Sequence, residues 1–170
     1  MKKYAIDFQN NIFRRPGPFL QCCLFKKKIL KNMKTLMDSK SIPSEDWDFF
    51  INLSYINPII GFSKQVGFTW NLSNESQSSD LFKEAVGIEN IIKKHKKKII
   101  QLCGIRILSD HYRRIARIYE QLNDYKKIKY FYKKSFLTAP YYWKNIIYFL
   151  ATIKNNPKFY FIKKIRKLKN

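Results

Sequence analysis

The chain has 170 residues, 45% of them hydrophobic and 16% aromatic, which is too apolar a composition for a disordered protein. Lysine and arginine total 34 against 12 acidic residues, so the formal net charge is +22. No apolar run approaches the roughly 18–20 residues of a membrane-spanning helix, and no secretory signal opens the sequence. The three cysteines fit neither a disulfide framework nor a zinc site. We therefore expect a protein of the reducing cytoplasm.

The positive charge is distributed unevenly along the chain. Residues 1–90 carry 12 basic and 9 acidic side chains, whereas residues 91–170 carry 22 basic and 3 acidic ones. Such asymmetry predicts two parts with these boundaries. A part this basic attracts nucleic acid or acidic lipid, or is simply solvated. A lysine-rich composition of the whole chain is the simplest explanation of the charge.

The first half contains short elements of mixed type. In chain order the sequence predicts a buried strand leading into a helix start (19–30), a loop (31–43), a short amphipathic helix (44–54), strand-like runs (59–70) and a polar loop (71–80). In the amphipathic helix, Ser44 is the expected N-cap. Acidic residues in its first turn favour the positive end of the helix dipole. We expect Asp48 to face solvent.

The sequence predicts that the second half is helical from Leu81 onward. Apolar residues share one face over 108–122 and another over 128–139, with a turn at Asn123 and Asp124 between them. A third helical segment follows from Trp143. A single helix pair cannot bury its apolar face alone, so it needs a neighbour. Within the lysine run 93–98, we expect His95 to be solvated.

Residues 111–140 resemble a tetratricopeptide repeat. The positions that carry the resemblance are Tyr112, Ile115, Ala116, Tyr119, Tyr125, Tyr132, Ser135 and Pro140, whereas Ile128 departs from it because a small residue is usual there. The resemblance implies an antiparallel helical hairpin and says nothing about chemistry.

A different resemblance covers residues 19–78. An apolar segment that turns basic is followed by a Glu-Asp pair opening a helix, a Trp, a strand-like stretch and a polar loop rich in Ser and Asn. This order resembles the C-terminal half of family-2 glycosyltransferases of the GT-A type. It implies an α+β fold, with a partial acceptor-side segment of a few strands over residues 1–90. A basic, tetratricopeptide-like helical region would follow over residues 91–170.

The resemblance also implies site residues. Asp46 would be the general base that takes the proton of an acceptor hydroxyl, and Glu45 would orient the loop or contact the acceptor. Trp47 would stack on a sugar ring, with a place in the core as its alternative. For the two carboxylates the alternative is an ordinary helix start. We do not interpret Asp46-Trp47-Asp48 as a metal-binding triplet, and no metal site is expected.

The implied function is sugar transfer from a nucleotide sugar to a saccharide or lipid-linked acceptor. Because no nucleotide-binding half precedes Phe19, the chain would be a fragment that is inactive alone and needs a separate nucleotide-binding partner. A divalent metal, Mg²⁺ or Mn²⁺, is expected only with that half.

Residues 158–170 predict a basic amphipathic helix, suited to an anionic membrane surface at the inner face of the membrane or simply solvated. The alternative function is a non-enzymatic helical-repeat module that binds a partner protein. Nucleic-acid binding is a further alternative that rests on charge alone.

Overall fold

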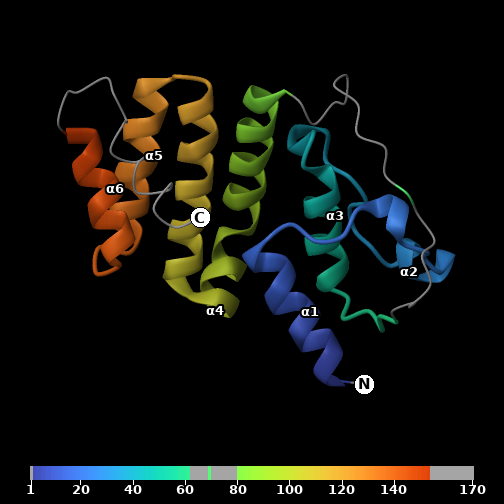
Figure 1. Cartoon of the computed structure of the whole chain (residues 1–170). Helices are drawn as coiled ribbons and strands as arrows, with labels where there is room; N and C mark the ends of the chain where they lie inside the picture. Colours follow the sequence, from blue (N-terminus) through green and yellow to red (C-terminus); the bar gives the residue numbers. More distant parts are fainter. Residues whose placement is uncertain (1, 62–68, 70–79, 154–170) are drawn as a thin grey trace. The chain divides into compact units, whose positions relative to one another are not determined.

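The computed structural model describes residues 2–61, 69 and 80–153, and every regular element within them is helical (Figure 1). The α-helices are α1 (Lys2–Arg14), α2 (Lys27–Lys31), α3 (Glu45–Ser54), α4 (Leu81–Gln121), α5 (Tyr125–Thr138) and α6 (Trp143–Ile153). Two short 3-10 helices, η1 (Leu20–Cys22) and η2 (Ser39–Ser41), lie between them.

The expected α+β fold, with a partial GT-A-like segment of strands, is therefore wrong for the part of the chain that the structure describes. The predicted buried strand at the start of 19–30 is the 3-10 helix η1, followed by extended chain in which Leu24 is 103% exposed. The physical reason is that an apolar run of a few residues becomes a buried strand only where neighbouring strands cover it. Most of the strand-like stretch 59–70 and all but the last residue of the polar loop 71–80 lie outside the described residues.

The chain divides into two compact units, Met1–Cys103 and Gly104–Asn170. The division falls inside α4, where Gly104 has φ 80° and ψ 168° and interrupts the helix. A positive φ of this kind is readily adopted only by glycine, so this residue type permits the break. The two units are described separately below.

Unit 1 has a core built from α1, α3 and the first segment of α4. The indole Nε1 of Trp47 donates a 2.7 Å hydrogen bond to the backbone oxygen of Ile12 and so links α3 to α1. Buried residues of α4 recur every three or four positions, namely Ala85, Ile88, Ile91, Ile92, His95 and Ile99. Gly87 lies so close to the loop before α3 that a Cβ atom would approach the Ser41 backbone oxygen to 2.6 Å. The helix predicted at 44–54 is present as α3, although Ser44 makes no side-chain capping bond.

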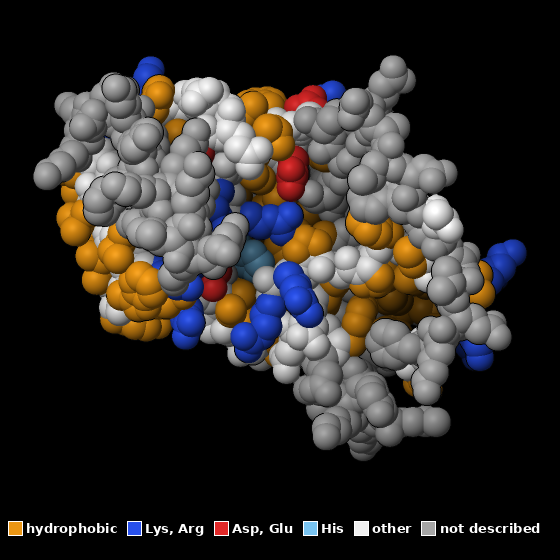
Figure 2. Space-filling view, in the orientation of Figure 1, with side chains coloured by type: hydrophobic (Ala, Val, Ile, Leu, Met, Phe, Trp, Pro, Cys, Tyr) orange, Lys and Arg blue, Asp and Glu red, His pale blue; other side chains and the backbone are white. Residues whose placement is uncertain are grey.

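Unit 2 contains the second segment of α4 together with α5 and α6. The predicted helix pair is present, with a turn in which Asn123 has φ 56° and Asp124 caps α5 by accepting from the Lys127 backbone N–H. The helix α6 packs on α5, and the best-defined contacts are stacked rings. Hydrophobic side chains nevertheless remain at the surface over α6, at the left of Figure 2.

Candidate functional site

The three predicted site residues lie together at the start of α3. The carboxylate of Asp46 accepts a 3.1 Å hydrogen bond from the backbone N–H of Leu20. Glu45 has one buried carboxylate oxygen without a hydrogen-bond partner. Trp47 is only 2% exposed, which places its ring in the core, the alternative given for it above. The roles of these residues in sugar transfer stay predictions.

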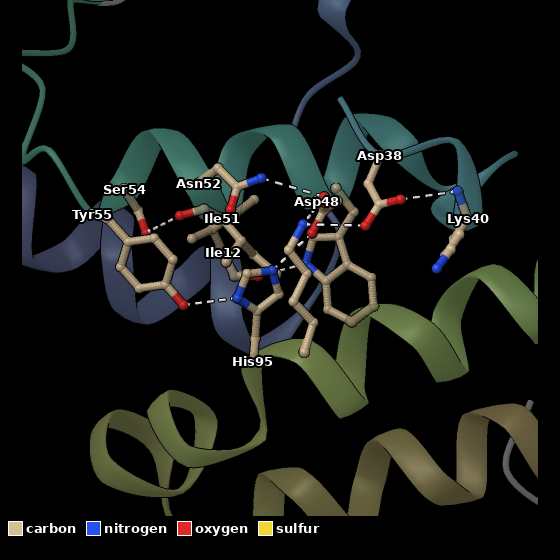
Figure 3. Close-up of polar contacts among 11 residues, drawn as sticks. Ile12, Asp38, Lys40, Asp48, Ile51, Asn52, Ser54, Tyr55 and His95 are labelled. Atoms are coloured by element: carbon tan, nitrogen blue, oxygen red, sulfur yellow. Dashed lines mark hydrogen bonds and ion pairs between the residues drawn. The ribbon is translucent and has the colours of Figure 1, made fainter. Parts of the chain in front are cut away.

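The most connected polar cluster of unit 1 is centred instead on Asp48, the next residue of α3 (Figure 3). Its side chain is fully buried. One carboxylate oxygen lies 2.7 Å from His95 Nε2. The other accepts hydrogen bonds from Lys94 Nζ at 2.7 Å and from Asn52 Nδ2 at 3.3 Å. A buried carboxylate needs several donors of this kind to offset the loss of its hydration.

Burial by itself would raise the pKa of Asp48, but the hydrogen bonds from His95 and Lys94 and the charge of Lys94 outweigh it and hold the pKa below its usual range. The carboxylate is therefore ionised at neutral pH. An ionised carboxylate only accepts hydrogen bonds, so Nε2 of His95 must carry the proton in this contact. In the neutral ring Nδ1 is then an acceptor, and it lies 2.7 Å from the hydroxyl of Tyr55. The hydroxyl, the imidazole and the carboxylate form one directed chain of hydrogen bonds.

The outer end of this chain does not act as a base at neutral pH. Burial, together with the negative charge of Asp48, raises the pKa of Tyr55 to about 12. The phenol therefore stays protonated and serves as a donor, although its residue is 43% exposed. The geometry supports a buried hydrogen-bonded link that holds α3 to α4, rather than a relay that delivers protons to a substrate.

Lys94 extends this hydrogen-bonded cluster to the loop before α3. Its ammonium also lies 3.5 Å from a carboxylate oxygen of Asp38. Asp38 in turn accepts a hydrogen bond from the backbone N–H of Lys40. The cluster thus joins three segments of unit 1: the loop, α3 and the first segment of α4.

Two expectations from the sequence are wrong at this cluster. His95 was expected to be solvated and is 4% exposed, and Asp48 was expected to face solvent and is completely buried. The lysines around His95 concealed its place on the buried face of α4. The signal that could have found it is the spacing from Ile88, Ile91, Ile92 and Ile99, which puts position 95 on the same face.

In unit 2 the notable surface is the exposed side of α5. We call Lys126, Lys129, Tyr130 and Lys133 the lysine face, because they are exposed and lie on one side of this helix. The helix contains no acidic residue.

The three acidic residues of unit 2 are engaged elsewhere: Asp110 with Arg113, Glu120 with the Tyr132 hydroxyl, and Asp124 at the cap of α5. The charge of the lysine face is therefore not neutralised within its own helix.

No group of residues that could hold a metal ion occurs in the ranges that the structure describes. Within the same ranges, no helix has the length and apolarity needed to cross a membrane. The basic amphipathic segment predicted at 158–170 lies outside them.

No family model matches the chain, and no curated protein or solved structure matches it. Together with the helical architecture, this overturns the resemblance to a family-2 glycosyltransferase followed by a tetratricopeptide-like tail. What remains of the tetratricopeptide resemblance is the antiparallel helix pair, which shows a geometry and not a family.

Proposed function

We propose that the chain is a non-enzymatic α-helical interaction module, which binds an acidic segment of another protein through the lysine face of α5. The observation that carries the proposal is the arrangement of Lys126, Lys129 and Lys133, which are exposed along one helix that has no acidic residue. An uncompensated row of this kind attracts anionic partners and raises the rate at which they associate.

The character of the surrounding surface favours a protein over a nucleic acid. Large apolar side chains are exposed in the same unit, among them Leu137 at 65% and Leu150 at 55%. Phosphate backbones offer such side chains nothing to bury against, whereas an amphipathic peptide does. Nucleic-acid binding remains the outcome that would replace this proposal.

Fluorescence anisotropy of a labelled 20-residue glutamate-rich peptide tests the proposal. Reversing the charge of Lys126, Lys129 and Lys133 to Glu should weaken binding by about tenfold or more at low ionic strength, and added salt should reduce the difference. The matched control reverses three exposed lysines of unit 1, namely Lys93, Lys96 and Lys97.

Equal losses in the two triple variants would mean that the peptide senses only net charge, and the proposal would fail. A labelled 20-residue oligouridine is the competing probe. Tighter binding of the RNA at physiological salt, lost in the α5 variant, would assign the lysine face to nucleic acid instead.

Sugar transfer is a second candidate, kept without the strand-containing segment on which it first depended. The observation in its favour is that Glu45 and Asp46 open α3 side by side, where the helix dipole stabilises an ionised carboxylate. A transfer assay with mixed uridine- and guanosine-diphosphate sugars tests it. Because the chain is expected to be inactive alone, the assay includes a separate nucleotide-binding glycosyltransferase half. Product formation that Asp46→Asn abolishes and Asp38→Asn retains would support sugar transfer, and absence of product from the wild-type mixture would remove it.

A further inference from the structure

The outward side of α6 is apolar along its whole length. Trp143, Ile146, Leu150 and Ile153 are between 37% and 55% exposed, and their spacing of three, four and three residues puts them on one side of the helix. We call these four residues the α6 apolar face. Trp143 and Leu150 are on the side away from Tyr148 and Phe149, the residues through which α6 stacks on α5, whereas Ile146 and Ile153 border Phe149 on the helix surface. The ring stacking on α5 therefore leaves Ile146, Leu150 and Ile153 partly exposed, and hydrophobic side chains are visible at the surface over α6 (Figure 2).

The packing of α6 on α5 sets one edge of this face beside lysines. Tyr132 stacks on Tyr148 with 5.1 Å between ring centroids, and Phe136 stacks on Phe149 with 4.9 Å. Because α5 and α6 are antiparallel, Lys133 of α5 lies near the level of Phe149 of α6, and Lys129 lies near the level of Ile153. With about 100° per residue, both lysines are on the side of α5 that adjoins the Ile146 and Ile153 edge of α6.

We propose that the α6 apolar face binds an amphipathic helix of another protein, whose apolar side covers this face and whose acidic edge meets Lys129 and Lys133. The inference rests on the proposed function and specifies its partner. Helices recognise such surfaces with apolar anchors repeated every three or four residues, and the α6 apolar face has the same three- and four-residue intervals. With 11 residues, α6 is about 16 Å long, so a partner helix of three to four turns spans it.

Charge selects this occupant over a second copy of the chain. The described part of unit 2, residues 104–153, carries 10 basic and 3 acidic side chains, so two copies packed through this face would bring like charges together. A partner with an acidic edge meets the opposite sign at the lysines and an apolar surface at α6. An amphipathic partner helix therefore complements both the lysines of α5 and the apolar face of α6, whereas a purely acidic or purely apolar segment complements only one of them.

Two labelled peptides of identical composition test the inference. The first places Leu at i, i+3, i+4 and i+7 with Glu along one edge, and the second has the same residues scrambled. We expect the first to bind at least about tenfold more tightly to the full chain. The double variant Ile146→Asp, Leu150→Asp should remove this preference. The matched control is Leu24→Asp with Ile59→Asp, which changes two exposed apolar residues of unit 1.

The outcomes separate the inference from the proposed function. If both peptides bind equally and the α6 variant changes nothing, while the α5 charge reversals weaken binding, the helix-docking inference is wrong and the proposed function stands. If neither peptide binds, both are wrong. Circular dichroism checks that the variants keep their helix content, and the single change Leu150→Ser provides a milder variant if the double one does not fold.

Other occupants would give distinct results that overturn the inference. A dimer that forms with concentration in sedimentation and is lost in the α6 variant would identify a second copy. Tighter peptide binding in Ile165→Asp would mean that the chain's own C-terminal segment competes for the face.

Discussion

Asp48→Asn replaces the buried carboxylate of α3 by a neutral side chain of nearly the same size, and we expect it to lower the free energy of unfolding by about 3 kcal/mol. The carboxylate interacts with three donors: His95 and Lys94 at 2.7 Å each and Asn52 at 3.3 Å. An amide oxygen can still accept some of these bonds, but the amide nitrogen then faces another donor.

The magnitude follows from burial and charge. Breaking a buried charge pair by changing one partner costs about 3–5 kcal/mol. Lys94 has a side chain that is 33% exposed and regains part of its hydration, which puts the expected loss at the lower end of that range. Hydrogen bonds to charged groups contribute about 1.5–3 kcal/mol each, and this gives the same order.

Urea denaturation followed by far-UV circular dichroism measures the loss by linear extrapolation. Asp38→Asn is the matched control, because Asp38 contacts the same lysine at 3.5 Å with both side chains partly exposed. Its loss should stay below about 1 kcal/mol. If Asp48→Asn costs no more than Asp38→Asn, the reasoning about the buried cluster is refuted.

The pH dependence provides a second check of the same carboxylate. The hydrogen bonds that hold the pKa of Asp48 below its usual value stabilise the folded state fully above the unfolded pKa of about 3.9. That contribution is lost as the pH falls through the lower folded pKa. The difference in stability between wild type and Asp48→Asn should therefore shrink between about pH 5 and about pH 2. A difference that grows on acidification would contradict the assigned direction.

Three further substitutions, one of them with a matched glycine control, test separate contacts. Tyr55→Phe removes the hydroxyl that donates to His95 and should cost about 1 kcal/mol in urea denaturation; an unchanged midpoint would contradict that bond. Gly87→Ala should cost at least about 1 kcal/mol, because its Cβ would meet a backbone oxygen at 2.6 Å. Gly61→Ala, with nothing within 4 Å, should change stability by less than about 0.5 kcal/mol. Asn145→Ala removes a fully buried amide that bonds to several groups of unit 2, and it should cost about 2–4 kcal/mol in thermal unfolding, a loss that a peripheral asparagine would not show.

The helices that were predictable are those with strong local signals. Acidic residues in its first turn and apolar residues spaced by three and four located α3. The turn at Asn123 and Asp124 located the boundary between α4 and α5 because Asn tolerates a positive φ and Asp caps the next helix. Such signals depend on a few neighbouring residues, so they hold without knowledge of the rest of the fold.

The features that were missed depend on partners distant in the sequence. Asp48 and His95 are 47 residues apart, and each is a reasonable surface residue until the other is placed against it. The apolar stretch that begins at Phe19 predicts a strand, because nothing local shows whether another segment covers it. In the structure Leu24 is fully exposed, and the backbone N–H of Leu20 in η1 donates to the Asp46 carboxylate.

The proposed function depends on the binding of an acidic partner at unit 2. Backbone amide shifts in a two-dimensional NMR titration with the amphipathic acidic peptide test it most directly. We expect the shifts that change to cluster on α5 and α6, around Lys129, Lys133 and Ile146, with the α3 start unchanged. Changes confined to Glu45–Trp47, or no localised change at saturating peptide, would contradict the account.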